Sequence, residues 1–129
     1  LGMNTWGRKM YSKVLLVFIG GGIGTVLRFL LNTLINVSSL PQFSTLFINV
    51  LGSFLFGIIY SLVAENSMVS IFLLTGILGG FTTYSQFTFD LIELNTQSQL
   101  STLGYFFSTV LLSIFGALIG VYIGSKMVN

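Results

Sequence analysis

Four long apolar stretches, separated by short polar connections, occupy most of this sequence. An α-helix needs about 20 predominantly apolar residues to cross the hydrocarbon core of a bilayer. The pattern therefore predicts four membrane-spanning helices, at residues 14–35, 44–64, 70–94 and 101–124. Because the connections are short, consecutive helices are expected to run antiparallel. We interpret residues 1–129 as one four-helix membrane domain that begins with a basic lead-in at residues 1–13.

The third apolar stretch is interrupted near its middle by residues 79–87, GGFTTYSQF. Backbone that is not helical is tolerated at membrane depth only where it is buried in protein or lines a water-filled cavity. Two glycines followed by hydroxyl-bearing residues therefore predict a broken helix, with an ion or substrate site at the break.

The composition supports an integral membrane protein and excludes several other classes. Only 6% of the residues are charged, whereas a soluble domain carries about 25%. The sequence has no Cys and no His, which excludes thiolate and imidazole catalysis and the usual zinc and haem ligands. Three acidic residues are too few for us to expect an enzyme: Glu65, Asp90 and Glu93. The net charge of +2 is too small to indicate a nucleic-acid partner.

The basic residues are concentrated near the chain ends, at Arg8, Lys9, Lys13 and Lys126. A basic segment before an apolar stretch also fits a signal peptide, but this stretch is long and no small-residue cleavage site follows it, so we expect a retained helix. Four spans put both ends on one side, and the connections at 36–43 and 95–100 contain no Lys or Arg. This bias predicts a multi-pass protein of the cell membrane with cytoplasmic termini.

Polar residues recur at helical spacing within the spans. Arg28 has two interpretations: its long side chain reaches the membrane surface, or it is a fixed charge that attracts an anion or fastens the helix break. Thr45, Asn49 and Ser53 form one stripe on the second span, and Thr109 and Ser113 form another on the fourth. Such stripes most often hydrogen-bond neighbouring helices, and they can also line a polar path.

Two aromatic residues beside the break add a third kind of candidate group. Tyr84 and Phe87 are three residues apart and share a helix face. An aromatic ring has a positive edge, which can meet an anion without offering a competing charge. Neutral donors and ring edges together fit a small, strongly hydrated anion that must be held weakly enough to be released.

Three segments together resemble the Fluc (CrcB-type) family of fluoride channels. They are GGGIGTVLRF at 20–29, TLFINVLGS at 45–53 and the interrupted segment at 79–87, and residues 113–124 match the family's fourth helix more loosely. The resemblance implies an antiparallel dimer of oppositely oriented subunits with two fluoride pathways and a central structural Na⁺. It also implies passive export of cytoplasmic fluoride.

The resemblance also assigns individual residues. It implies that the carbonyls of Gly79 and Thr82 hold Na⁺, and that Arg28 is a vestibule or structural residue. The fluoride pathway would be lined by Asn49, Tyr84, Phe87, Thr45, Thr83, Thr109 and Ser113. The chain departs from the family pattern at Tyr84, where the family has Phe, and at Gln86, where it usually has Thr.

Three alternatives remain open at this point. Because the charge bias predicts one orientation, the chain could act only in a heterodimer with a related subunit of opposite orientation. It could also be a subunit that supports a partner without conducting. A small proton-coupled multidrug transporter is the third alternative, but it needs a membrane carboxylate, and the first, second and fourth spans contain none.

Overall fold

The computed structural model describes residues 2, 4–36 and 41–129. The regular elements in these residues are all helical, and four helical segments are long and apolar enough to cross a membrane. The segments are α1 (Thr5–Ile35), α2 (Pro41–Leu62), the third span from α3 to α5 (Met68–Asn95), and α6 (Gln99–Val128). The prediction of an all-helical membrane fold with four spans and an interrupted third span is confirmed.

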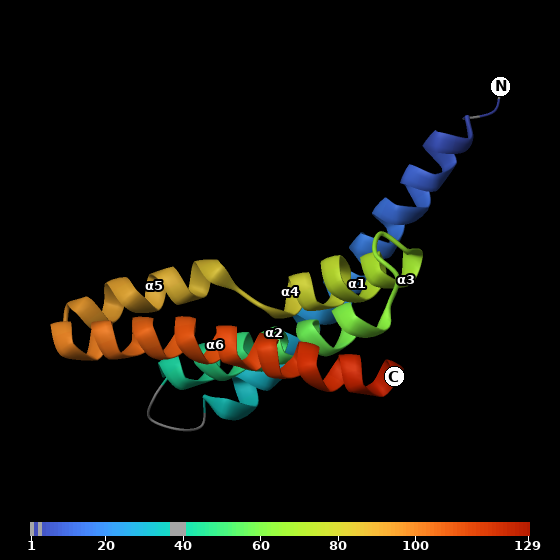
Figure 1. Cartoon of the computed structure of the whole chain (residues 1–129). Coiled ribbons are helices and arrows are strands. Elements are labelled where there is room, and N and C mark those ends of the chain that lie inside the picture. Colours follow the sequence, from blue (N-terminus) through green and yellow to red (C-terminus); the bar gives the residue numbers. More distant parts are fainter. Residues whose placement is uncertain (1, 3, 37–40) are drawn as a thin grey trace.

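The first helix is longer than the apolar stretch alone predicts. It begins at Thr5, because the Oδ1 of Asn4 accepts a hydrogen bond from the N–H of Gly7 at 2.7 Å and caps the first turn. The basic lead-in is therefore the first part of α1, and it projects away from the other helices (Figure 1). The second helix also begins early, at Pro41, since proline is well suited to a first helical turn.

Glycines let the helices pack closely in two pairs. A Cβ atom on Gly24 of α1 would collide with the carbonyl of Ile77 in the third span, and one on Gly120 of α6 would collide with the carbonyl of Phe54 in α2. Close backbone approach is the usual reason for small residues between membrane helices. The glycine-rich faces of α1 and α6 are thus used for packing within the chain.

The third span is made of four pieces: α3 (Met68–Ser70), the π-helical η1 (Ile71–Leu78), α4 (Gly79–Phe81) and α5 (Tyr84–Asn95). Only Thr82 and Thr83 leave the helical conformation, with φ/ψ of −83°/156° and −145°/116°. Figure 1 shows this short extended link between α4 and α5. The break is therefore narrower than the segment 79–87 that the sequence indicated.

The two glycines before the break are helical, which corrects the expectation that they open the helix. A Cβ atom on Gly80 would collide with the carbonyl of Gly21 in α1, so this glycine allows close helix packing. Aromatic residues that we placed in the interrupted segment, Tyr84 and Phe87, belong to the first turn of α5. The hydroxyl pair Thr82–Thr83 alone forms the extended part.

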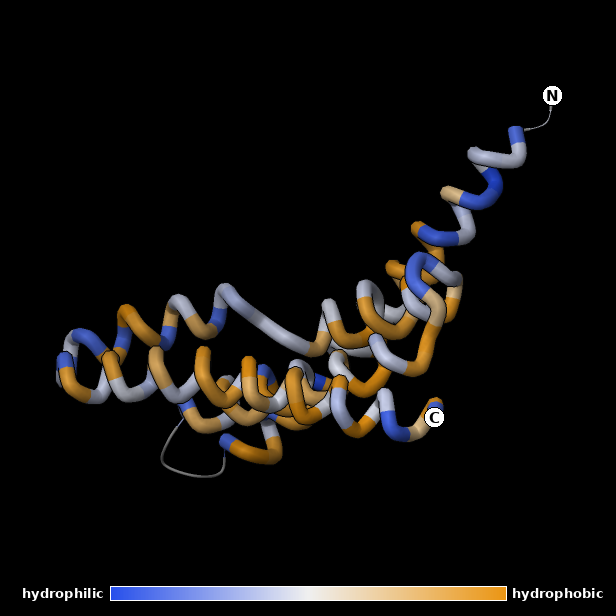
Figure 2. Tube along the Cα trace, in the orientation of Figure 1, coloured by the Kyte–Doolittle hydropathy of each residue, from blue (hydrophilic) through white to orange (hydrophobic). Residues whose placement is uncertain are grey.

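Apolar side chains cover the outer surface, as expected for helices in lipid. Figure 2 shows apolar positions along the helices and polar ones gathered at the N-terminal end of α1 and on α5. The small buried core consists of Ile48, Leu78 and Phe81, which join α2 to η1 and α4, the two pieces of the third span nearest to the break on its N-terminal side. The break is thereby attached to the core on its α4 side.

Candidate functional site

Asn49 of α2 holds the extended link with both ends of its side-chain amide. Its Nδ2 donates to the carbonyl of Thr83 at 3.0 Å, and its Oδ1 accepts a hydrogen bond from the Thr83 N–H at 2.8 Å. Both backbone polar groups of Thr83 are therefore satisfied, although the helix has ended. Hydrocarbon offers no replacement for these bonds, so this pairing makes the break possible at membrane depth.

Arg28 and Thr25 of α1 satisfy a carbonyl at the end of α4. Arg28 Nε donates to the carbonyl oxygen of Gly80 at 3.1 Å, and Thr25 Oγ1 donates to the same oxygen at 3.4 Å. The last carbonyls of a helix have no donor within that helix. Of the two interpretations of Arg28, its half-buried side chain matches the one in which it fastens the helix break.

A pocket of about 360 Å³ lies beside the break, between α2, α5 and α6. Its lining among the described residues contains no charged side chain. We call it the polar pocket, and six residues expected in the fluoride pathway line it: Asn49, Thr83, Tyr84, Phe87, Thr109 and Ser113. The structure thus brings together residues from three helices that are far apart in sequence.

Three residues named by the sequence lie outside the polar pocket: Arg28, Thr45 and Gly79. Thr45 is 3% exposed and lines a smaller pocket of about 150 Å³ on the Arg28 side of the break. Gly79 lines neither pocket. Arg28 lines the smaller pocket together with Thr45, so of these three candidates only Gly79 lines neither pocket in the described structure.

Among the described residues of the polar pocket, Thr109 has a fully buried hydroxyl that lacks a hydrogen-bond partner. Its side chain is 5% exposed, and its Oγ1 is buried near the Tyr105 hydroxyl but makes no hydrogen bond of good geometry in the described structure. A buried hydroxyl without a partner costs about 1–3 kcal/mol, so such groups call for a water or ligand. The hydroxyl is available to donate to a solute in the polar pocket.

The aromatic residues of the polar pocket differ strongly in burial. Phe87 is 6% exposed, whereas Tyr84 is 81% exposed. The Phe87 ring centroid lies 6.0 Å from that of Tyr84 and 5.5 Å from that of Tyr105, in tilted arrangements. Tilted rings present edges as well as faces, and the edges carry the partial positive charge. Phe87 is therefore held firmly in the wall of the pocket.

A buried carboxylate beside this cluster was missed at the sequence level. Asp90 is 3% exposed, and its two oxygens accept hydrogen bonds from the Tyr105 hydroxyl at 2.8 Å and from Gln86 Nε2 at 2.9 Å. The sequence alone shows Asp90 only as one of three acidic residues and assigns it no role. The available signal was the four-residue spacing of Gln86 and Asp90, which puts them on one helix face. Buried acids in membrane helices are functional candidates.

Removing the Tyr105 hydroxyl should destabilise the protein because it leaves one Asp90 oxygen without its donor. We expect Tyr105→Phe to lower the free energy of unfolding by about 1.5–3 kcal/mol, the range for hydrogen bonds to charged groups. Asp90→Asn with Tyr105→Phe should cost less than the two single changes added together. Thermal unfolding in detergent measures the cycle, and full additivity would contradict the pairing.

The carbonyls of Gly79 and Thr82 have lost their usual helical donors. The Thr83 N–H, four residues after Gly79, bonds to Asn49, and the Gln86 N–H, four residues after Thr82, bonds to the Thr83 Oγ1. Oxygen ligands of this kind suit hard cations such as Na⁺. The residues therefore fit the expected ion, but two carbonyls are too few, so further oxygens must come from elsewhere.

These features define a multi-pass membrane protein with an uncharged polar pocket at a broken third span. The chain belongs to the family described as CrcB-like protein, Camphor Resistance (CrcB), which matches residues 15–124. The resemblance stated from the sequence is thus confirmed.

Curated relatives cover most of the chain and share one description, fluoride-specific ion channel FluC. The relative from Thermus thermophilus is 37% identical over 124 residues, which cover 92% of this chain and 99% of that protein. The relative from Rhizobium meliloti is 38% identical over 124 residues, with 91% and 99% covered. A third, from Azobacteroides pseudotrichonymphae, is 42% identical over 101 residues, with 73% and 80% covered.

Proposed function

We propose that this chain forms a fluoride-selective passive channel through which cytoplasmic fluoride leaves the cell. Its relatives are described as fluoride-specific ion channels. The observation that carries the proposal is the buried Thr109 hydroxyl, which has no partner in the described structure and lines a pocket of neutral polar groups. No catalysed step is involved, and the sequence contains no nucleotide-binding G-x-x-x-x-G-K-[ST] motif to drive transport.

The polar pocket supplies what a dehydrating fluoride ion needs. A conducted ion must exchange its water for donors that hold it weakly enough to let it leave. The Asn49 amide uses one N–H for Thr83 and has a second available. The Thr109 hydroxyl and the Phe87 ring edge complete a set of neutral donors. A positively charged group in the same place would bind the anion too tightly for fast passage.

Two such subunits in opposite orientations would form the working channel, with two fluoride pathways. The supporting feature is the exposed polar start of α5, where Tyr84, Ser85 and Gln86 are all exposed beside the break. Polar groups facing lipid at this depth are costly. A second subunit would cover them and complete the walls of both polar pockets.

The same arrangement would supply the missing ligands of a structural Na⁺. In a dimer related by a two-fold axis, the carbonyls of Gly79 and Thr82 would meet their counterparts from the other subunit. Four carbonyl oxygens would then surround the ion. When bound, Na⁺ would offset the dipoles of the helix ends and fasten the two breaks together.

The charge bias bears on which subunit is the partner. Basic residues on the exposed start of α1 favour one orientation, with the termini in the cytoplasm. We therefore propose a related, oppositely oriented subunit as the alternative partner. Cysteine labelling at residue 97 in whole cells should show this loop outside in nearly all copies. Equal populations of both orientations would instead support a homodimer.

A proton-coupled multidrug transporter is the competing class, and Asp90 is the one observation in its favour. Such a transporter needs a membrane carboxylate that exchanges protons with a cationic substrate. Asp90 is 3% exposed, and each of its oxygens already accepts a hydrogen bond. It also does not line the polar pocket. The geometry therefore favours the channel.

Growth in fluoride tests the proposal in cells. Expression of the chain should restore the growth of a bacterium that lacks its own fluoride exporter, because passive efflux lowers cytoplasmic fluoride. A Phe87→Ile variant, produced at the same level, should restore growth poorly since it lacks the ring edge. Unchanged sensitivity with the normal chain in the membrane would count against a self-sufficient channel.

Replacing Tyr84 by Phe tests whether its hydroxyl limits conduction. The side chain is 81% exposed and its hydroxyl has no partner in the described structure, so its removal should leave the fold intact. We expect fluoride efflux from Tyr84→Phe liposomes to lie between the original rate and about three times that rate. An increase of this size corresponds to the loss of one weak hydrogen bond between the Tyr84 hydroxyl and the passing ion. A loss of efflux would assign the hydroxyl an essential part in conduction.

A further inference from the structure

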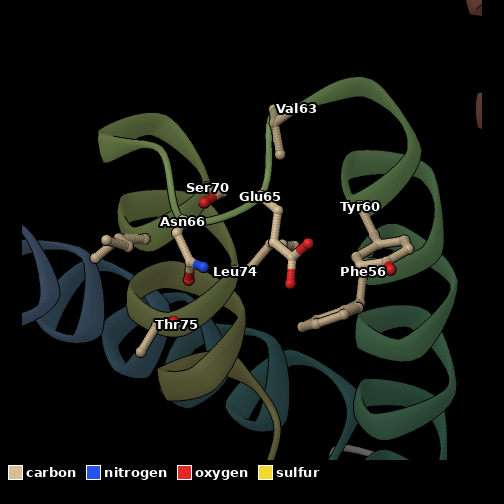
Figure 3. Close-up of a pocket in the computed structure, with 9 residues that line it drawn as sticks. Phe56, Tyr60, Val63, Glu65, Asn66, Ser70, Leu74 and Thr75 are labelled. Atoms are coloured by element: carbon tan, nitrogen blue, oxygen red, sulfur yellow. The ribbon is translucent and has the colours of Figure 1, made fainter.

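A second pocket, of about 370 Å³, lies beside the loop that joins α2 to α3. It is lined by Phe56 and Tyr60 from α2, by Glu65 and Asn66 from the loop, and by Thr75 of η1 among others. We call it the loop pocket. Figure 3 shows the Glu65 carboxylate and the Asn66 amide directed into it, with the two rings opposite. None of these residues has a part in the proposed fluoride pathway.

The carboxylate of Glu65 is unpaired in the described structure. It takes part in no hydrogen bond or ion pair there. The helix α2 ends at Leu62, so Glu65 lies just beyond the end of a span, at the level where lipid headgroups meet water. A free negative charge at this level attracts a cationic group from the solvent or from the headgroup layer.

The two rings make the opposite wall of the loop pocket. Phe56 and Tyr60 are one helical turn apart on α2 and stack at 6.4 Å between centroids with 15° between their planes. They are 43% and 56% exposed, so their surfaces are open to an occupant. An ammonium group within about 6 Å of a ring centroid is attracted to the ring face. A carboxylate facing aromatic rings is thus suited to an organic ammonium ion.

The position of the loop pocket favours a lipid as the source of that ammonium. Phe56 lies about two turns inside the end of α2, so the pocket continues from the headgroup level towards the hydrocarbon. Its apolar lining there, including Leu74, suits the start of an acyl chain. A soluble amine would leave this apolar part of the pocket without an occupant.

We propose that the loop pocket binds the primary ammonium headgroup of a membrane lipid, of the phosphatidylethanolamine type. The Glu65 carboxylate accepts hydrogen bonds from the ammonium N–H groups, and the Asn66 amide oxygen is a further acceptor. The rings of Phe56 and Tyr60 cover the apolar flank of the headgroup. This site is separate from the polar pocket and does not depend on fluoride conduction.

Native mass spectrometry of the purified full-length chain tests the proposal. The protein is given equal amounts of phosphatidylethanolamine and phosphatidylcholine with the same acyl chains, and the retained lipids are counted. We expect about ten times as much retained phosphatidylethanolamine as phosphatidylcholine, because only the primary ammonium donates hydrogen bonds to Glu65. In Glu65→Gln the ratio of the two retained lipids should fall to about one. Glu93→Gln is the matched control, because Glu93 is exposed on α5 and lines neither the loop pocket nor the polar pocket. It should keep the preference.

A second experiment tests whether lipid retention depends on the ammonium of the headgroup. Excess ethanolamine should displace the retained lipid better than excess choline, since only ethanolamine has ammonium N–H groups. A Phe56→Leu variant should also weaken retention while keeping the charge of Glu65. The proposal fails if Glu65→Gln retains the same lipid ratio as the original chain. It also fails if the original chain retains no lipid. This result is expected if a second subunit covers the loop pocket.

Discussion

Asn49→Leu should abolish most fluoride conduction and destabilise the protein. The change removes both hydrogen bonds to Thr83, which leaves one N–H and one C=O of the extended link unsatisfied at membrane depth. At about 1–3 kcal/mol for each buried unsatisfied group, the free energy of unfolding should fall by about 2–6 kcal/mol. The polar pocket also loses an amide donor, so efflux should fall at least about a hundredfold.

Ser53→Ala is the matched control for this prediction. Ser53 lies one helical turn after Asn49 and lines the same pocket, but its hydroxyl has no partner in the described structure. We expect its thermal unfolding midpoint to stay close to that of the original chain. If Asn49→Leu unfolded at the same temperature as Ser53→Ala, the amide would not be what holds the break.

Thr109→Val should separate function from stability. The buried Thr109 hydroxyl has no partner in the described structure, so its replacement by a methyl group of similar size removes an unsatisfied donor. The unfolding free energy should stay the same or rise by about 1 kcal/mol. Fluoride efflux should nevertheless fall about tenfold, because the ion loses one hydrogen bond on its path.

Thr102→Val provides the comparison on the same helix. The Thr102 hydroxyl donates to the carbonyl of Ser98 at 2.8 Å and does not line the polar pocket. This change should leave efflux close to the original rate. Equal efflux from Thr109→Val and from the original chain would show that the Thr109 hydroxyl is not part of the pathway, and would remove the main structural support for it.

The membrane fold could be predicted because it depends on properties of single stretches. Length and apolar composition decide whether a helix crosses a bilayer, so four spans followed directly from the sequence. The position of the break did not follow in the same way. The glycines looked like its cause, yet Gly80 is helical and allows contact with Gly21, while the extended link is held by Asn49 from another span.

Only those site residues could be predicted that helical spacing or the family resemblance indicated. Both indicated Asn49, Phe87 and Thr109, and the fold gathers them into one pocket. The hydrogen bond between Asp90 and Tyr105 joins residues from different helices, so the periodicity within either helix does not predict it. The hydrogen bonding of Asn49 to Thr83 could not be predicted for the same reason, because it joins the second span to the third.

Fluoride efflux from liposomes that contain only this purified chain tests the central claim most directly. A fluoride electrode follows release, and chloride release from matched liposomes is the control for selectivity. The account predicts fast fluoride efflux without chloride leakage, reduced by Asn49→Leu and by Thr109→Val. Equal release of both ions would contradict a fluoride-selective pathway. Absence of release from well-folded protein would contradict a channel made of this chain alone, and would favour the related partner subunit.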